Sequence, residues 1–75
     1  MVSDKKKCSL AFGDTMTKAR EKKGLQQWEV ADKLGISQPY YCYLEKGQRV
    51  IDLDMALKVC KLLGIDLNEF VRTYR

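Results

Sequence analysis

Apolar residues recur every three or four positions along most of the chain, which is the spacing that places them on one face of a helix. Glycines at positions 24, 35, 47 and 64 each follow such a stretch and precede a new start signal. A glycine just past a helix fits the left-handed position that ends it. The pattern predicts helices from residue 12 or 14 to 23, over 27–34 and 38–46, from 53 to 63, and a short one from 67.

No segment alternates apolar and polar residues for long enough to be a strand, so the predicted fold class is all-α, a compact bundle of five short helices. Ser37, Asp52 and Asp66 are expected N-caps. Gln26 is a poor capping residue, although Glu29 could supply half of a capping box. The expected inward faces hold Phe12, Met16, Ala19, Val30, Ala31, Leu34, Leu53, Ala56, Leu57, Val59, Cys60, Leu63, Leu67, Phe70 and Val71.

The length and the charge distribution divide the chain into two parts, an N-terminal arm and one domain. Seventy-five residues make one domain, and 14 Lys and Arg against 10 Asp and Glu give a net charge of +4. Residues 1–9 are polar and include three consecutive lysines, so they are expected to form a flexible basic N-terminal arm, with the domain over 10–75. This arm is either a solvated tail or a segment that seeks phosphate.

Cysteine and histidine usage narrows the chemistry. The three cysteines, Cys8, Cys42 and Cys60, are widely spaced, and the chain has no histidine. This predicts no metal site, no disulfide framework, no cofactor and a reducing compartment. No segment resembles a signal peptide or a membrane span, which predicts a cytoplasmic protein. An enzyme is the weakest reading, because no cysteine has a base beside it and no glycine-rich phosphate loop is present.

The segment from 27 to 46 carries the most specific pattern. It reads QWEVADKL, then GIS, then QPYYCYLEK. Ala31 lies where two helices must approach closely, Gly35 makes the turn, and Ile36 is expected to tuck beneath it. Pro39 falls in a first helical turn, where its missing N–H costs nothing. This spacing is typical of a helix-turn-helix.

With its flanks, the segment KGLQQWEVADKLGISQPYYCYLEKGQR, followed by LLGI and NEFV, resembles the phage-repressor and Cro class (XRE-type) of helix-turn-helix domains over roughly residues 10–71. The resemblance implies a lambda-repressor-like fold whose third helix enters the major groove of double-stranded DNA. It also implies a buried structural salt bridge between Arg20 and Glu45. Trp28 departs from the family, and could cover the edge of the first helix, stack near the DNA backbone or serve a partner.

Counting about 100° per residue separates the predicted helix 38–46 into two sides. Tyr41 and Leu44 fall on the core side, and Tyr40 lies at the rim, where it either covers the core edge or reaches a phosphate. The outward arc holds Gln38, Pro39, Cys42, Tyr43 and Lys46.

Chemistry assigns roles to this arc as hypotheses. Gln38 can pair with adenine, Pro39 can meet a thymine methyl, and Tyr43 can pack on a methyl or sugar. Cys42 would face the bases as a small filler rather than a redox sensor. The expected phosphate contacts are Gln27, which in the family also braces the residue matching Gln38, together with Tyr40, Lys46, Gln48 and Arg49.

The expected function is that of a transcriptional regulator, a repressor, acting as a homodimer on a palindromic operator with half-sites about 34–36 Å apart. The interface candidates are Val50, Ile51, Phe70, Val71 and Tyr74. No small-molecule ligand is expected, because the chain has no room for a sensing domain. The alternatives are an antitoxin that also binds a toxin, and a helix-turn-helix module that binds only proteins.

Overall fold

The computed structural model describes residues 4–74, and over this range the chain is all-α with five helices and no strand. The helices are α1 (Asp4–Lys22), α2 (Gln27–Leu34), α3 (Gln38–Glu45), α4 (Leu53–Leu63) and α5 (Leu67–Tyr74). The predicted fold class is therefore confirmed. None of the helices in the described range has the length and apolar character needed to cross a membrane.

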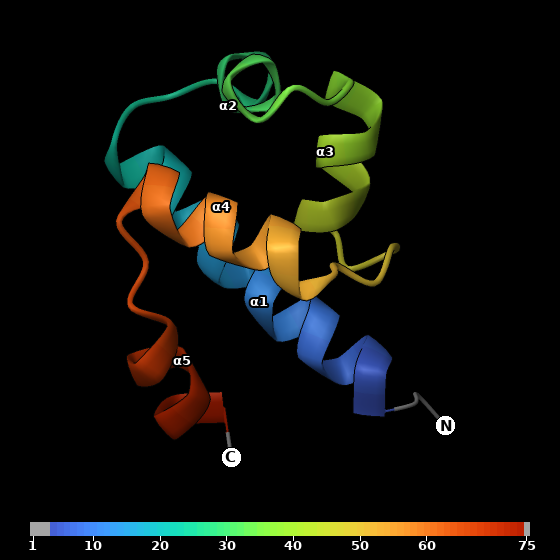
Figure 1. Ribbon diagram of the computed structural model, residues 1–75, viewed down its shortest axis with the longest axis vertical. Helices are drawn as coiled ribbons and strands as arrows, with labels where there is room; N and C mark the ends of the chain where they lie inside the picture. The colour runs from blue at the N-terminus through green and yellow to red at the C-terminus, as the bar shows by residue number, and fades with distance from the viewer. Residues whose placement is uncertain (1–3, 75) are drawn as a thin grey trace.

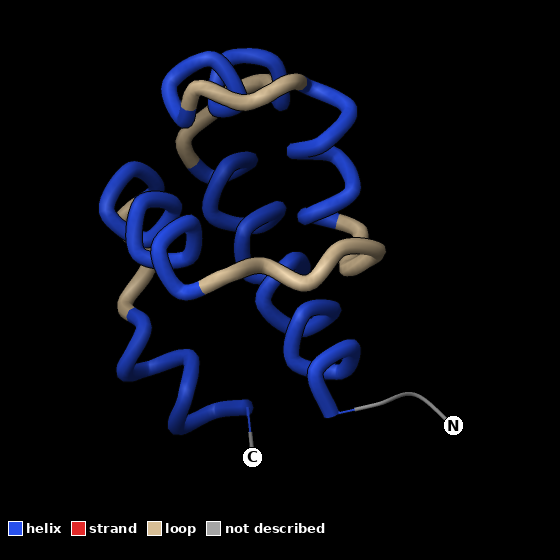
Figure 2. The backbone as a smooth tube through the Cα atoms, turned by 45° about the vertical axis from the view of Figure 1, so that its right-hand side comes forward, coloured by secondary structure: helices blue, strands red, loops and turns tan. Residues whose placement is uncertain are grey.

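The long helix α1 is the element around which the others are arranged. It packs against α3, α4 and α5, while α2 packs against α3. Figure 1 shows α4 crossing α1, with α2 and α3 at one end of the molecule and α5 at the other. The turned view of Figure 2 shows that short loops make all the connections. The helix-turn-helix segment is thus presented at one end.

Local sequence signals set the helix boundaries, as predicted. Ser37 Oγ accepts the backbone N–H of Tyr40 at 3.2 Å, and Asp52 Oδ1 accepts that of Met55 at 2.8 Å. Asp66 Oδ1 accepts the N–H of Asn68 at 3.0 Å at the start of α5. The four glycines at positions 24, 35, 47 and 64 all have φ between 70° and 72°. Each therefore holds the left-handed conformation that ends a helix.

The hydrophobic core joins α1 to α2, α3 and α4. Among the described residues, it contains ten buried apolar side chains. The largest of those that are completely buried are Tyr41, Met16, Leu44, Val30 and Val59. Cys60 belongs to this core, as its place on the α4 stripe predicts. Phe70 of α5 meets Phe12 of α1 edge to face, with 5.1 Å between the ring centroids. This aromatic pair fastens the last helix to the bundle.

Three residues expected on the inward faces are exposed instead: Leu53 by 70%, Leu57 by 51% and Val71 by 52%. The prediction was wrong because α4 packs mainly against α1 and buries only the stripe of Ala56, Val59, Cys60 and Leu63. Such a helix buries an arc of about 100°, and Leu53 and Leu57 lie beyond its edge. Val71 lies about 100° around α5 from Phe70, the residue that meets α1.

The N-terminal prediction also needs correction, since α1 begins at Asp4 and not near residue 12. Residues 4–9, expected in a flexible arm, form the first turns of this helix. Ser9 is buried, and it precedes Phe12 and Met16 at the spacings that continue one helix face. The polar composition of the segment hid this face. Residues 1–3 of the expected arm lie outside the described residues.

Gly13 allows α1 and α3 to approach closely. It is buried in the interior of α1, and a Cβ built on it would lie 2.7 Å from the backbone carbonyl oxygen of Leu44 and even closer to that of Glu45. Real Cβ atoms do not come so near to a backbone oxygen. A residue with no side chain is therefore required where α1 crosses the last turn of α3.

We predict that Gly13→Ala destabilises the domain. Elsewhere in a helix this change is favourable by about 0.5–1 kcal/mol, but here the methyl group would push α1 and α3 apart at a cost of about 1–3 kcal/mol. Thermal unfolding followed by circular dichroism measures the difference. Lys18→Ala, on the exposed side of the same helix, is the control and should change little. A Gly13→Ala melting temperature at or above the wild-type value would contradict the close approach.

Candidate DNA-binding surface

The turn between α2 and α3 has the geometry that its sequence predicts. Ala31 is buried at the junction, and the backbone N–H of Ile36 donates to the Ala31 carbonyl at 3.0 Å across Gly35. Ile36 is half-buried beneath the turn. The two helices are therefore held at a fixed angle by a small residue, a left-handed glycine and an apolar anchor.

The helix α3 has one buried and one exposed side, as the angular spacing predicts. Tyr41 and Leu44 are buried, and Tyr40 is at the rim of the exposed side. The solvent-facing residues are Gln38, Pro39 and Tyr43, with Lys46 at the C-cap and Cys42 half-buried beside them. This face carries no charge before Lys46, so hydrogen-bonding and apolar groups dominate it.

The loop after α3 brings its polar side chains next to this face. Lys46, Gln48 and Arg49 are exposed there. Gly47 between them is buried, and a Cβ built on it would lie 2.7 Å from Leu10 Cα. The loop thus rests against α1, which holds the two basic residues beside the end of α3.

A buried ion pair connects α1 to α3. Arg20 Nε donates to Glu45 Oε2 at 2.7 Å and Arg20 Nη2 to Glu45 Oε1 at 3.3 Å. Arg20 Nη1 donates to the carbonyl of Leu25 at 2.8 Å. The two side chains are only 12% and 4% exposed. The predicted structural salt bridge is therefore present, and it also holds the chain that leads into α2.

Comparison with known proteins agrees with this geometry. The sequence model of the family described as Helix-turn-helix matches residues 16–70, which include all of α2, α3 and α4. The chain belongs to the helix-turn-helix family.

Two relatives are regulators of Bacillus subtilis strain 168. The uncharacterized HTH-type transcriptional regulator YqaE is 33% identical over 61 residues, covering 81% of this chain and 53% of the relative. The SPbeta prophage-derived uncharacterized HTH-type transcriptional regulator YonR is 37% identical over 57 residues, covering 76% and 53%. The chain therefore spans about half the length of these relatives. No solved structure matches it.

Gln27 makes a hydrogen bond to Glu45 that the sequence did not predict. Its amide Nε2 donates to Glu45 Oε1 at 2.9 Å, and the side chain is half-buried. The expected partner was Gln38, so in this state the amide braces the buried ion pair instead. Gln27 lies at the start of α2, where backbone N–H groups face outward. Its predicted contact with a phosphate therefore stays a proposal.

Tyr41 adds a hydroxyl to the same cluster. The side chain is fully buried, and its hydroxyl has no hydrogen-bond partner among the described residues. Burial raises the pKa of Tyr41 far above its ordinary value, and the nearby Glu45 carboxylate raises it further. The hydroxyl therefore lies beside the Glu45 carboxylate, at the limit of hydrogen-bonding geometry.

The charge of Glu45 is set by two opposing effects. Burial by itself would raise the pKa of Glu45, but hydrogen bonds, led by the one from Arg20, outweigh it and hold the pKa below its ordinary value. The carboxylate correspondingly raises the pKa of Arg20 against the opposing effect of burial. Both groups are therefore charged at neutral pH.

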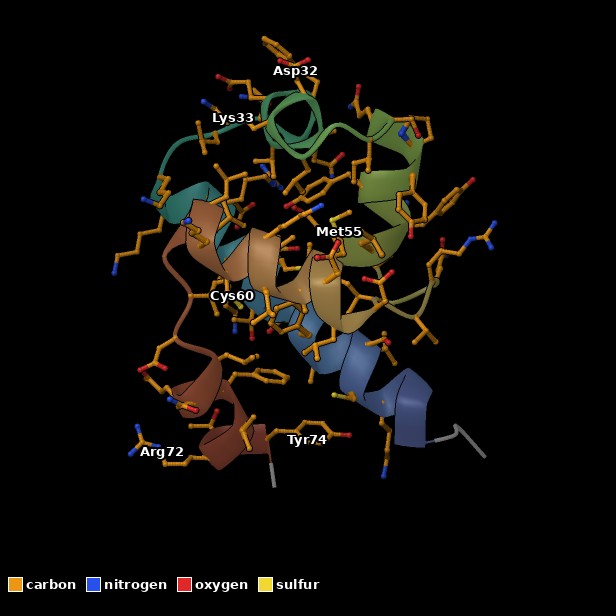
Figure 3. The ribbon with its side chains drawn as sticks, viewed as in Figure 1. Asp32, Lys33, Met55, Cys60, Arg72 and Tyr74 are labelled. Carbon is orange, nitrogen blue, oxygen red and sulfur yellow. The ribbon has the colours of Figure 1, made fainter. Side chains whose placement is uncertain are left out.

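The outer face of α2 is of mixed charge. Figure 3 shows Asp32 and Lys33 pointing away from the body of the molecule, at the end where α2 and α3 lie. Trp28, on the same helix, is among the exposed large hydrophobic side chains. More than half of the Trp28 side chain is therefore open to solvent, and it is not part of the buried core.

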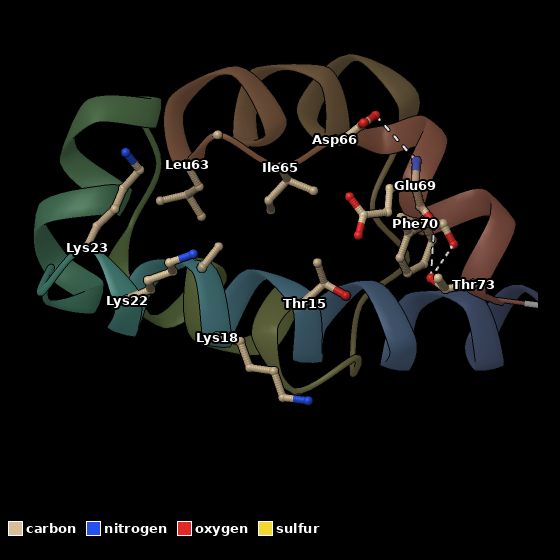
Figure 4. A pocket seen from close by; sticks show the side chains of 12 residues that line it. Thr15, Lys18, Lys22, Lys23, Leu63, Ile65, Asp66, Glu69, Phe70 and Thr73 are labelled. Carbon is tan, nitrogen blue, oxygen red and sulfur yellow. Dashed lines mark hydrogen bonds between the residues drawn. The ribbon is translucent and has the colours of Figure 1, made fainter.

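The described residues outside α2 and α3 form no candidate metal-binding site. Among the residues described, no three His, Cys, Asp or Glu side chains gather where they could hold a metal ion. An open groove of about 740 Å³ runs between α1, the end of α4 and α5. Figure 4 shows lysines 18, 22 and 23 along one part of it and Asp66 and Glu69 along another. This groove uses no residue of α2 or α3.

We predict that Glu45→Gln lowers the free energy of unfolding at pH 7 by about 3–5 kcal/mol, because it leaves the buried Arg20 charge without a counter-charge. The pKa of Glu45 is lower in the folded state than in the unfolded state. The stability that it contributes is therefore present above the unfolded pKa and lost as pH falls through the folded pKa.

The gap between wild type and Glu45→Gln should accordingly narrow below about pH 4.5, the ordinary value for this group. Urea unfolding between pH 3 and pH 7 measures it, with Glu69→Gln, on the surface of α5, as the control. A gap that is the same at every pH would show that the buried pair does not have this role.

Proposed function

We propose that this chain is a sequence-specific DNA-binding repressor that acts as a homodimer on a palindromic operator. The observation that supports this most is the uncharged, exposed face of α3, anchored from behind by the buried Arg20–Glu45 pair and followed by basic residues in the loop. Bound at an operator, such a protein represses by excluding other proteins from the same DNA.

Base recognition is assigned to the exposed face of α3. The Gln38 side chain, at the N-terminal end, can donate to and accept from the N7 and N6 groups of an adenine. Pro39 and the ring of Tyr43 offer apolar contacts suited to a thymine methyl. The half-buried Cys42 lies between them and allows a close approach of the base edge.

Phosphate contacts are assigned to the two margins of this face. Lys46, Gln48 and Arg49 would clamp the backbone at the C-terminal end of α3. Tyr40 at the rim and Gln27 at the start of α2 would contact the phosphates at the other margin, where the backbone N–H groups of α2 favour an anion. These contacts fix the register of α3 in the groove and carry no sequence information.

The homodimer proposal rests on the size of the reading surface and on an exposed apolar patch. One module of this kind reads only a few base pairs, and two copies on one face of the duplex double the site. Val50, Leu53 and Leu57 are all exposed and, with the half-buried Ile51, directly follow the loop that is proposed to hold phosphate. A second copy at this patch would place both recognition helices on the same DNA.

The other interface candidates, Phe70, Val71 and Tyr74, lie on α5, and Phe70 lines one apolar groove together with Val50, Ile51 and Leu53. The ring of Phe70 packs on Phe12, and it stacks with Tyr74 at 5.7 Å between centroids. These aromatic side chains therefore pack α5 onto α1. The patch of Val50, Leu53 and Leu57 is the interface that we favour.

Selection of bound DNA from a random pool should yield a palindromic site. On that site, Gln38→Ala should lose about 1–3 kcal/mol of binding free energy and accept other bases at one position of each half-site. Arg49→Ala should weaken binding to all sequences alike and lower the salt slope by about one. Fluorescence titration at several salt concentrations measures both. If Gln38→Ala lost the same binding free energy on every DNA sequence, Gln38 would not be a base-reading residue.

Leu53→Glu should shift the chain from dimer to monomer, because the new charge would be buried against the second copy. Sedimentation equilibrium at several concentrations measures the association constant in the absence of DNA. Val71→Glu is the matched control, since it places the same charge on an apolar position of α5 that is also exposed, by 52% against 70% for Leu53. A larger effect for Val71→Glu than for Leu53→Glu would move the interface to α5.

A further inference from the structure

The groove between α1, the end of α4 and α5 carries opposite charges at its two ends. Its volume is about 740 Å³. Lys22 and Lys23 lie at one end, and Asp66 and Glu69 lie at the other (Figure 4). All four side chains are exposed, and none forms an ion pair with a described residue. The charges at the two ends therefore do not neutralise each other directly, and they remain open to a partner.

Between the charged ends, apolar side chains from all three helices line the groove. Ala19 of α1 and Phe70 of α5 are half-buried, and so is Ile65 in the turn that joins α4 to α5. Leu63, at the end of α4, is buried beneath them. Half-buried apolar side chains leave a surface in water that a partner would gain free energy by covering. The groove thus has an apolar floor with a basic and an acidic end.

The helical walls of the groove restrict the kind of partner that fits. The backbone N–H and C=O groups of a helix are bonded within the helix, so an extended peptide finds no free strand edge here. The carboxylates of Asp66 and Glu69 would repel the phosphates of a nucleic acid. An amphipathic helix needs neither contact, because its apolar stripe covers the floor and its charged side chains meet the two ends.

We propose that this groove is a docking site for an amphipathic helix of a partner protein. The helix lies along the groove with an acidic N-terminal end at Lys22 and Lys23 and a basic C-terminal end at Asp66 and Glu69. This order of charges is also the one that stabilises a helix, since carboxylates favour its N-terminus and cations its C-terminus. The partner helix is therefore complementary to the groove in one direction only.

This docking goes beyond the proposed recognition of DNA and does not rest on it. The groove uses no residue of α2 or α3, so a helix bound there leaves the exposed face of α3 uncovered. The chain can therefore hold DNA and a protein partner at the same time.

Two synthetic peptides test the direction of docking. Each has about 14 residues, a length at which an isolated helix begins to be stable in water, and each carries leucines at helical spacing. The first has glutamates in its first turn and lysines in its last turn, and the second has these charges exchanged. A central side-chain cross-link keeps both helical, which circular dichroism verifies. The wild-type chain should bind the first peptide about three- to tenfold more tightly in fluorescence anisotropy. Equal affinities, or no binding of either peptide, would overturn the proposal.

Exchanging the charges of the groove gives the sharper test. In the double variant Lys22→Glu, Glu69→Lys, the preference should invert, so that the second peptide binds more tightly. The matched control is Asp54→Lys, Lys58→Glu, which exchanges an exposed ion pair on α4 outside the groove. The control should keep the wild-type preference. Both variants change only exposed side chains, and their melting temperatures show that the fold is retained. A double variant of the groove that still preferred the first peptide would contradict the docking.

The same groove variant separates this surface from the DNA-binding surface. It should bind the selected DNA as the wild type does, and the wild-type chain bound to that DNA should still bind the first peptide. A loss of DNA affinity as large as that of Arg49→Ala would assign Lys22 to a phosphate and overturn the proposal. If the wild-type chain binds no DNA at low salt, the proposed function fails, while the two peptides still decide the docking.

Discussion

Arg20 and Glu45 meet in the interior where α1, the start of α2 and the end of α3 come together, and the candidate DNA-binding surface depends on this contact. Its two hydrogen bonds between α1 and α3, and a third to the carbonyl of Leu25, constrain three segments at once. A buried pair of this kind adds little net stability compared with apolar packing. What it supplies is direction, because an Arg–carboxylate fork has a fixed geometry.

The backbone approach at Gly13 belongs to the same junction. Glu45 can reach Arg20 because α1 has no side chain where the carbonyl groups of Leu44 and Glu45 pass. The amide of Gln27 completes the cluster from α2. The helix α3 is therefore positioned by polar contacts at its C-terminal end and by the turn at its N-terminal end. Its outward face takes no part in these contacts.

This separation shapes the proposed chemistry of recognition. The exposed face of α3 has one amide, at Gln38, and otherwise apolar or weakly polar groups. Positive charge lies after the helix, at Lys46 and Arg49. Such an arrangement favours sequence readout through shape, methyl groups and one bidentate pair, with phosphate attraction confined to the margin.

The sequence by itself was sufficient for the local features. The N-caps Ser37, Asp52 and Asp66, and the glycines that end helices, were predictable because capping and φ preferences act within a few residues. The division of α3 into a buried and an exposed side followed from helical periodicity. The Arg20–Glu45 pair, 25 residues apart, was reached only through the family resemblance and not from spacing.

Only the tertiary structure decided features that depend on which element lies alongside. Leu53 and Leu57 were predicted inward, and they are exposed because α4 packs mainly against α1 and buries a narrower stripe than its apolar residues span. The first turns of α1 were predicted as a flexible arm, and they are helical because the helix face of Phe12 and Met16 continues back through Ser9. Likewise, no periodicity directs the Gln27 amide to Glu45. Composition and spacing fix which face a residue occupies, but burial and hydrogen bonding need a partner that lies far away in the sequence.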